Sequence, residues 1–351
     1  MTHLPPSEPG SDSSTTRPGR HVVVVGATGN VGTSVVRALA ADPSVGSVLG
    51  LARRLPDWRP AKTRWRAVDI EPGGADLTHH FDGADAVIHL AWKFRPTHDP
   101  AETWRTNVLG SIRVFDAVVA AGVPALVYAS SVGTYSPGPK DHAVDESWPT
   151  HGWPGAAYCR EKAYVERLLD GFETAHPAVR VVRMRPGFLF KREAACEQRR
   201  IFAGSLLPGR LVRPGLIPAV PDLPGLRFQA LHTDDAAAAY AAAVARPVHG
   251  AFNLAAEPAL DARVLAGILA SRPVRVPETA VRAALATAWR LHFVPASPDL
   301  FDAVLRLPLM DSSRAREVLG WRPWYSSVEA VQEFLAGLRE RAGMPTAPLA
   351  A

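Results

Sequence analysis

A tyrosine and a lysine stand four residues apart in the run Tyr158-Cys159-Arg160-Glu161-Lys162, a spacing that could carry proton chemistry. On a helix, positions i and i+4 lie on the same face, so the lysine ammonium can sit beside the phenol. A cation about 4 Å from a phenol is worth on the order of 4 kcal/mol at an effective dielectric near 20, or roughly three pKa units. The same spacing also occurs on ordinary amphipathic helices. As a chemical site, it predicts a lowered pKa for Tyr158 and proton exchange with a substrate hydroxyl near neutral pH.

A second set of residues could bind a phosphate. The run His21-Val22-Val23-Val24-Val25 is followed at once by Gly26-Ala27-Thr28-Gly29-Asn30-Val31-Gly32 and by a helical pattern to about residue 41. A strand that enters a glycine-rich turn and then a helix lets backbone N–H groups approach a pyrophosphate at the positive end of the helix. Glycines also serve in tight turns that bind nothing. Because the strand and the helix are both in place, we predict a dinucleotide site.

These residues need a scaffold, and the chain supplies the pattern of one. Short β-branched runs alternate with longer helical patterns, which is typical of a parallel sheet with helices on both faces. Helices are expected near residues 104–121 and 158–176. Strands are expected at residues 21–25, 48–52, 64–68, 86–90, 125–130, 179–184 and 251–254. We therefore predict an α/β fold, a Rossmann doubly wound parallel sheet with a smaller C-terminal substrate-binding domain.

The domain boundaries follow from changes in composition. Residues 1–20 are rich in Ser, Thr, Pro and Gly, with almost nothing to bury, and are expected to be a disordered tail. Stretches with many prolines are expected to be irregular and to cover the substrate. The expected division is a dinucleotide-binding domain at 21–185 with about 228–257, a substrate domain at 186–227 and 258–340, and a tail at 341–351.

Length and charge exclude several classes of protein. The chain of 351 residues can bury a sizeable core, and its formal charge of +5 does not indicate nucleic-acid binding. No apolar run approaches the roughly twenty residues of a membrane helix. Two cysteines cannot build a disulfide framework or a metal cage, and the histidines lack metal-ligand spacing. We expect a soluble cytoplasmic enzyme with a small-molecule substrate, and no metal, nucleic acid or membrane partner.

Taken together, the motifs resemble the extended short-chain dehydrogenases/reductases, the NAD-dependent epimerase/dehydratase family. The resemblance extends from the glycine loop to about residue 324. Its motifs are Gly26-x-x-Gly29-x-x-Gly32, Val68-Asp69-Ile70, His89-Leu90-Ala91, Asn107 with Gly110, Ser130-Ser131, Tyr158-x-x-x-Lys162, Arg185-Pro186-Gly187, His232-Thr233-Asp234-Asp235, Phe252-Asn253-Leu254 and Leu319-Gly320-Trp321-x-Pro323.

The resemblance implies a role for each motif. Ser131 is expected to hydrogen-bond the substrate oxygen, Tyr158 to be the acid and base, and Lys162 to hold the nicotinamide ribose. It also implies a bound nicotinamide dinucleotide and a homodimer. Asn107 is expected either to brace the active-site backbone through a water or to order its helix. The expected cofactor-binding residues are Gly26, Thr28, Gly29, Asn30, Val31, Gly32, Arg53, Arg54, Asp69, Ile70, Leu90, Ala91, Asn107, Tyr158 and Lys162.

The end of the second expected strand bears on cofactor choice. An acidic residue about twenty positions past the glycines would bind the ribose hydroxyls of NAD. Ala52 stands there, followed by Arg53 and Arg54. Two guanidiniums offer a site for the extra phosphate of NADP, so NADP is favoured over NAD. The alternative is that both arginines are solvated or that one stacks on the adenine.

Departures from the family pattern narrow the reaction. Dehydratases of the family carry Asp-Glu directly after the position of Ser131, where this chain has Val132-Gly133, so dehydration is rejected. Pro186 stands where nucleotide-sugar epimerases usually carry an asparagine, whereas six cationic residues between 191 and 213 suit a diphosphate or form a solvated face. The leading hypothesis is an epimerase-like oxidoreductase acting on a sugar or nucleotide sugar. An NADPH-dependent carbonyl reductase or hydroxysteroid-type dehydrogenase is the alternative, and a nonenzymatic dinucleotide sensor is a third.

Overall fold

A seven-stranded parallel sheet forms the centre of the computed structural model, which describes residues 19–94, 99–202 and 215–350. The strand order is β12-β7-β5-β4-β1-β2-β3, and every neighbouring pair is parallel. The strands are β1 (Arg20–Val25), β2 (Val45–Ala52), β3 (Thr63–Ala67), β4 (Ala86–His89), β5 (Ala125–Ala129), β7 (Arg180–Pro186) and β12 (Gly250–Leu254). The predicted doubly wound Rossmann fold is confirmed.

Side chains alternate between two hydrophobic layers. In β1, Val22 and Val24 face one layer, and Val23 and Val25 face the other; all four are buried. This is the period of two that a strand imposes, and each fully buried valine contributes roughly 1.5–3 kcal/mol. A sheet buried on both faces explains why the strands are continuous apolar runs rather than alternating ones.

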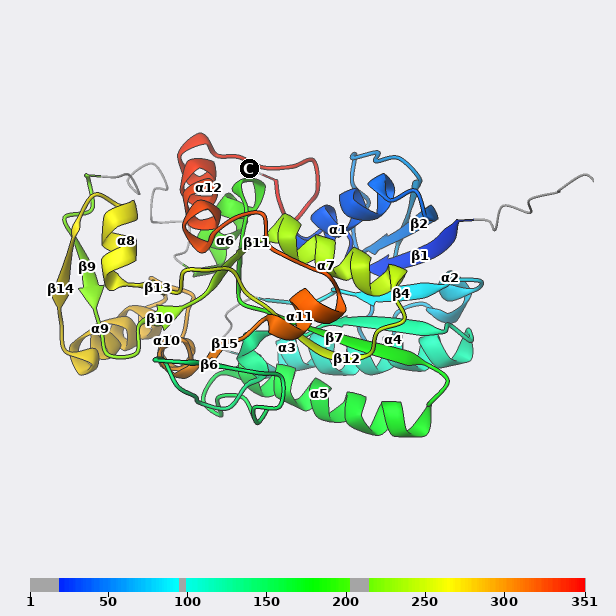
Figure 1. Ribbon diagram of the computed structural model, residues 1–351, viewed down its shortest axis with the longest axis horizontal. Coiled ribbons are helices and arrows are strands. Elements are labelled where there is room, and N and C mark those ends of the chain that lie inside the picture. The colour runs from blue at the N-terminus through cyan, green and yellow to red at the C-terminus, as the bar shows by residue number, and fades with distance from the viewer. Residues whose placement is uncertain (1–18, 95–98, 203–214, 351) are drawn as a thin grey trace, which may run out of the picture.

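Helices cover both faces of the sheet (Figure 1). The layer of Val22 and Val24 packs on α1 (Asn30–Ala41), α7 (Thr233–Ala245) and α11 (Ser313–Val318). The opposite layer packs on α2 (Thr78–Phe81), α4 (Gly110–Ala120) and α5 (Ala157–Ala175). The helix expected near 104–121 is in fact α3 (Pro100–Trp104), a π-helical turn (Arg105–Leu109) and α4 in succession.

The remaining elements lie at one end of the sheet and form the region expected to cover the substrate (Figure 1). The segments expected to be irregular contain several helices instead. They are short or begin at prolines and so lack a long periodic pattern. The helices are α6 (Ala195–Phe202), α8 (Ala262–Ile268), α9 (Glu278–Arg290) and α10 (Pro298–Arg306), and the longer α12 (Ser327–Glu340) follows the segments expected to be irregular. Short strands connect them: β6 (Ala143–Val144), β8 (Phe188–Phe190), β9 (Ala219–Asp222), β10 (Arg227–Phe228), β11 (Ala230–His232), β13 (Leu260–Asp261), β14 (Arg272–Arg275) and β15 (Leu309–Met310).

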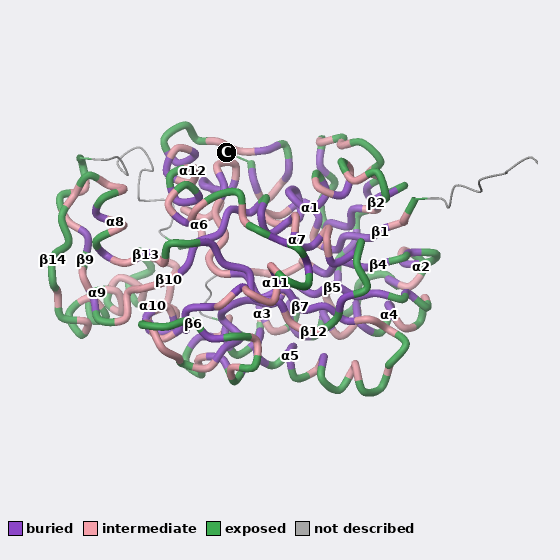
Figure 2. The backbone as a smooth tube through the Cα atoms, in the orientation of Figure 1, coloured by how far each residue is buried: buried purple, intermediate pink, exposed green. Residues whose placement is uncertain are grey.

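Burial differs strongly between the two regions (Figure 2). The central strands are buried, whereas α9 has no buried residue along its length. The tail expected at 341–351 is a wrong prediction for residues 341–350, because Thr346 and Leu349 are buried against the body of the protein. The expected disordered tail at 1–20 lies almost wholly outside the described residues; Arg20 begins β1.

Candidate active site

The strand order places a crevice at the carboxyl ends of β1 and β4, where successive connections leave in opposite directions. Gly26 follows β1 with a φ of +86°, and its N–H donates to Leu51 O at 2.9 Å. A Cβ at Gly26 would lie 2.6 Å from Ala91 N, and one at Gly32 would collide with Gly26 O. Only glycine lets β1, the loop and the segment after β4 approach so closely.

The loop ends at an open helix terminus. Gly29 is the N-cap of α1, and within the described chain no side chain caps that end. A Cβ at Gly29 would meet only Gly26 O, at 3.7 Å, so the loop is open on that side. Uncapped N–H groups at a helix N-terminus suit a phosphate, so the residues fit the pyrophosphate of a dinucleotide.

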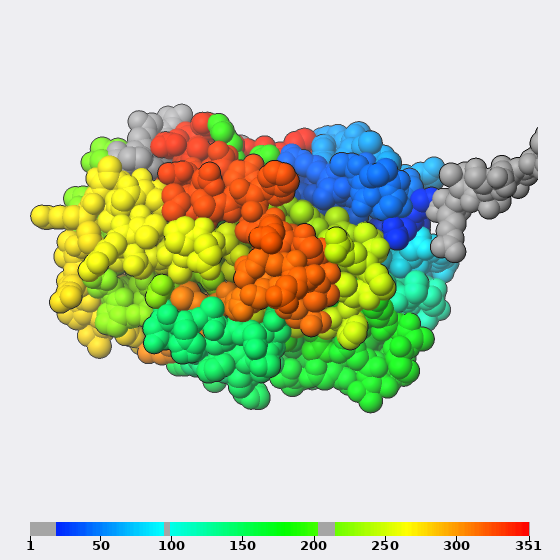
Figure 3. Space-filling view, viewed as in Figure 1, coloured from blue at the N-terminus to red at the C-terminus, as the bar shows by residue number. Residues whose placement is uncertain are grey.

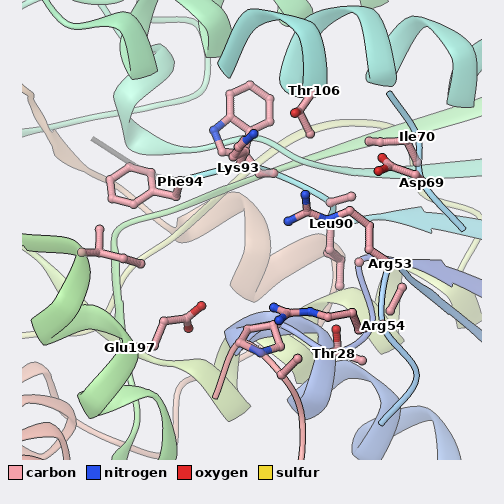
Figure 4. A pocket seen from close by; sticks show the side chains of 18 of the residues that line it. Thr28, Arg53, Arg54, Asp69, Ile70, Leu90, Lys93, Phe94, Thr106 and Glu197 are labelled. Atoms are coloured by element: carbon pink, nitrogen blue, oxygen red, sulfur yellow. The ribbon is translucent and has the colours of Figure 1, made fainter. Parts of the chain in front are cut away.

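A cleft of about 900 Å³ opens in front of the loop (Figure 4). Arg53 and Arg54 extend into it from the end of β2, and Asp69 and Ile70 line it from the end of β3. Such a volume suits an extended organic ligand. The predicted cofactor residues that line it are Gly26, Thr28, Gly29, Arg53, Arg54, Asp69, Ile70, Leu90 and Ala91.

Other predicted cofactor residues support the loop rather than line the cleft. Asn30 accepts a hydrogen bond from Thr233 at 3.1 Å through its side chain. Its carbonyl accepts one from the buried Lys191 ammonium at 2.7 Å, which also donates to Thr33 and Ser34. Val31 is half-buried in the first turn of α1, beside Gly32. These contacts hold the glycine loop and the start of α1 in place.

Tyr158 and Ser131 meet near the carboxyl end of β5. Ser131 follows β5 and caps a short helical turn by accepting from Gly133 N at 3.0 Å. The Tyr158 ring packs so close to that turn that a Cβ on Gly133 would lie 2.7 Å from Tyr158 Cε1. Burial raises the pKa of Tyr158, and a hydrogen bond with Ser131 partly offsets this. The two side chains predicted to share a substrate oxygen are therefore adjacent.

The expected lowering of the Tyr158 pKa by Lys162 is wrong for this arrangement. The ammonium of Lys162 donates to Ala129 O at 2.5 Å and lies 3.4 Å from the centre of the Trp92 ring. Burial lowers the pKa of Lys162 itself. A carbonyl and an aromatic face hold this cation. Helical spacing correctly places Lys162 on the inner face of α5 but does not determine which partner its side chain contacts.

Asn107 lies on the π-helical turn and braces the loop after β4 directly. Its side chain accepts from Lys93 N at 2.6 Å and donates to Glu161 at 2.7 Å. Thr103 donates to the other oxygen of Glu161 at 2.5 Å, and burial raises the pKa of this carboxyl. Glu161, Asn107 and Tyr158 line a second cavity of about 60 Å³. Of the two roles expected for Asn107, these direct contacts favour bracing of the loop after β4, and the role stays a prediction.

Two aromatic residues after β4 enclose Tyr158. Phe94 packs edge-on against its ring with centroids 4.7 Å apart, and Trp92 does so at 6.1 Å. Both also line the main cleft and the second cavity. Tyr158 itself lines the second cavity and is not among the residues that line the main cleft.

Comparison with known proteins agrees with this geometry. The family model described as NAD dependent epimerase/dehydratase family matches residues 22–255. The chain belongs to this family. The glycine loop, Ser131, Tyr158 and Lys162 all lie within the matched residues.

Individual relatives are distant. An uncharacterized protein of Mycobacterium tuberculosis is 25% identical over 92% of this chain, which spans only 30% of that relative's length. A UDP-glucose 4-epimerase of Mycolicibacterium smegmatis is 26% identical over 91% of this chain and 98% of its own. The solved UDP-glucose 4-epimerase of Thermus thermophilus, in complex with NAD, has a TM-score of 0.67 at 20% identity, covering 91% of this chain and 99% of that one. At that identity the structural likeness concerns the fold.

The basic residues between positions 191 and 213 have different surroundings. Lys191 is buried under the glycine loop, and Arg192 pairs with Glu340 at the end of α12. Arg200 lines the main cleft, whereas Arg210 and Arg213 lie outside the described residues. The described part of the cluster is therefore not one solvated face.

A buried ion network lies beneath the part of α5 that carries Tyr158 and Lys162. Glu166, one turn after Lys162, accepts from Ser130 at 2.5 Å and from both ends of the Arg185 guanidinium at 2.7 and 2.9 Å. Burial alone would raise the pKa of Glu166, but hydrogen bonds and charge from Arg185 outweigh it and lower the pKa to about 2. The network ties β5, α5 and β7 together behind Ser131 and Tyr158.

Sequence reasoning missed Phe94, Glu161 and Glu197 as site residues, and it named Arg200 only as one of the six cationic residues that suit a diphosphate or form a solvated face. Phe94 follows closely on a cofactor motif, and Glu161 directly precedes Lys162, so adjacency was an available signal. Glu197 lies across the cleft from Arg54 (Figure 4), and burial raises its pKa to about 7. No motif in the sequence marks that position.

In residues 19–94, 99–202 and 215–350, no three His, Cys, Asp or Glu side chains gather as metal ligands would. No helix in those same ranges is both long and apolar enough to span a membrane.

Proposed function

We propose that this protein uses a nicotinamide dinucleotide to oxidise and then re-reduce a hydroxyl-bearing carbon of a sugar or nucleotide sugar, as an epimerase does. The observation that carries the proposal is the contact between Ser131 and Tyr158, whose ring lines a small cavity that shares Trp92, Lys93 and Phe94 with the cleft in front of the glycine loop. The similarity to a relative named UDP-glucose 4-epimerase supports it. So does the NAD complex of the Thermus neighbour.

Tyr158 is the acid and base of the proposed reaction. The oxidation needs Tyr158 as the phenolate, to take the proton of the substrate hydroxyl, and the reduction needs the phenol, to return that proton to the substrate oxygen. Burial raises the pKa of Tyr158 in the described arrangement, which favours the phenol that the reduction uses. Ser131 holds the same oxygen by a hydrogen bond, and Lys162 lies one turn further along α5. The dinucleotide, when bound, supplies the hydride acceptor and donor. Asn107 keeps the loop after β4 in register with Tyr158.

The surroundings of Glu161 favour a substrate with several hydroxyl groups. Its carboxylate is 3% exposed, has two neutral hydrogen-bond donors, and lines the cavity beside Tyr158. A carboxylate oxygen has further lone pairs, so it can accept from a hydroxyl next to the reacting carbon. A sugar offers such a hydroxyl, whereas a steroid ketone does not.

A carbonyl reductase acting on an apolar substrate is the second candidate, because Trp92 and Phe94 form an aromatic wall around Tyr158. Pro186 also ends β7 where the family's nucleotide-sugar epimerases usually carry an asparagine. The nonenzymatic sensor is disfavoured, because Ser131, Tyr158 and Lys162 are all retained.

NADP is the proposed form of the cofactor, since Arg53 and Arg54 extend into the cleft from the end of β2. A 2′-phosphate there would gain charge-assisted hydrogen bonds. Replacing both by alanine is expected to weaken NADPH binding at least tenfold and NADH binding less than threefold, measured by fluorescence titration. Equal losses for the two nucleotides would contradict the preference.

The proposed reaction is tested by incubating the purified protein with UDP-glucose or UDP-N-acetylglucosamine and separating epimers by chromatography. Epimer formation without net change in the absorbance of reduced nicotinamide is the expected result. Net consumption of NADPH with an apolar ketone, and no epimer, would favour the reductase. Failure to bind NAD, NADH, NADP or NADPH would overturn both the epimerase and the reductase hypotheses. A homodimer in a cytoplasmic location completes the proposal, and sedimentation velocity tests the dimer.

A further inference from the structure

The end of the chain lies against the glycine loop. After α12 ends with Arg341 in a left-handed conformation, the chain turns toward α1, and in Figure 3 its last residues lie against the N-terminal part of the protein. We call residues 344–350 the C-terminal strap. Ala347 and Pro348 line the main cleft together with Thr28 and Gly29. This segment therefore contributes a wall to the space in front of the loop.

The strap is a folded element, held by its own hydrogen bonds. Met344 N donates to Leu349 O at 2.9 Å, and Leu349 N donates back to Thr346 O at 3.1 Å. Leu349 is fully buried and packs with Met344, Ala194 and Trp58. Trp58 lies between β2 and β3, so the strap connects the C-terminus to the edge of the sheet beside the cleft.

Two polar contacts tie the strap to the site itself. The buried Thr346 hydroxyl donates to Thr28 O, within the glycine loop, at 3.0 Å. Arg200, which lines the cleft from α6, donates to Pro348 O and Ala350 O at 3.1 Å. Thr346 thus engages a carbonyl of the loop, leaving the loop N–H groups for a pyrophosphate.

We propose that the C-terminal strap is part of the dinucleotide site, where it covers the pyrophosphate region and slows release of the bound cofactor. The inference rests on the proposed function, since an enzyme that returns its cofactor to the starting oxidation state each cycle gains from retaining it. A dinucleotide seated on the glycine loop would lie in a cleft that Thr28 and Gly29 line on one side and Ala347 and Pro348 of the strap on another. Its departure would require the strap to loosen or the ligand to leave past Phe94.

The test uses NADPH and the unaltered protein beside three variants. Thr346→Val removes the hydrogen bond to Thr28 with little change in shape, and a chain ending at Gly343 removes the strap. Glu340→Gln is the matched control, because it weakens an ion pair with Arg192 at the end of α12 without touching the cleft. Release of NADPH is followed by stopped-flow fluorescence after mixing with excess NADP, and affinity is followed by calorimetric titration.

Thr346→Val is expected to speed NADPH release about two- to tenfold, the range of one hydrogen bond. The shortened chain is expected to speed it more than tenfold, and Glu340→Gln to leave it unchanged. Unchanged release in Thr346→Val and in the shortened chain would overturn the proposal, and if the shortened chain does not fold, Thr346→Val alone decides. If the unaltered protein binds no dinucleotide, the proposed function fails, an outcome distinct from failure of the strap.

Discussion

Replacing Gly133 by alanine tests the placement of Tyr158 with a single methyl group. A Cβ at this position would lie 2.7 Å from Tyr158 Cε1 and 3.2 Å from Cδ1. Ordinary carbon contacts are about 3.5–4.0 Å, so the ring must withdraw by about 0.8 Å. Phe94 and Trp92 pack against the ring from other sides, which limits how it can move.

The expected effects follow from that displacement. Overpacking of this kind costs about 1–3 kcal/mol of unfolding free energy and lowers Tm by roughly 2–5 °C. A misplacement near 1 Å at a reacting group can reduce turnover by about 10²-fold, so Gly133→Ala is expected to lower kcat about 10- to 100-fold. Dinucleotide affinity should stay within about threefold of the unaltered protein, because the glycine loop is untouched.

The assay is epimerisation of UDP-glucose, followed by chromatography, with thermal unfolding measured in parallel. Gly171→Ala in α5 is the matched control, because a Cβ there meets no atom within 4 Å. In a helix this change stabilises by up to about 1 kcal/mol, and kcat should not change. Unaltered kcat and Tm in Gly133→Ala would refute the contact between Gly133 and Tyr158, and with it the assigned position of the phenol.

Three further outcomes are expected. Tyr158→Phe should abolish turnover and leave NADPH affinity within a few fold by fluorescence titration; a collapse of affinity would contradict its chemical role. The folded pKa of Glu197 is raised to about 7, so the proton that it binds stabilises the fold at pH 5, and this stabilisation is lost as pH rises through 7. Urea unfolding should therefore show Glu197→Gln to be more stable relative to the unaltered protein at pH 8 than at pH 5. The same difference in unfolding free energy at both pH values would argue against the raised pKa. The folded pKa of Glu166 is lowered to about 2, so its contribution of about 3 kcal/mol to the unfolding free energy is present above pH 4.5 and is lost as pH falls toward 2. Glu166→Gln should remove that part of the fall in unfolding free energy with acid. The same dependence of unfolding free energy on pH in Glu166→Gln and in the unaltered protein would contradict the network.

Periodicity and local motifs determined the fold and the positions of the main site residues. The valines of β1 and the glycines after it specify a strand, a turn and a helix within a dozen residues. Such local patterns are visible in a sequence because neighbouring residues impose them. The same holds for Tyr158 and Lys162, whose spacing on one helix follows from its pitch.

The side-chain partners were decided only by the tertiary structure. Helical spacing predicted Lys162 beside Tyr158, yet packing of the segment after β4 puts Trp92 over the ammonium instead. The short helices of the substrate region were read as irregular because their stability comes from packing rather than from a long pattern.

The C-terminal strap is the clearest case. Its composition reads as a tail, because seven residues cannot bury a side chain against one another. Leu349 becomes fully buried only because Ala194, Met344 and Trp58 are assembled around it. The sequence by itself therefore determined the elements and the residues carried on them. Long-range packing determined which residues meet at the site, because those contacts join segments that are far apart in the sequence.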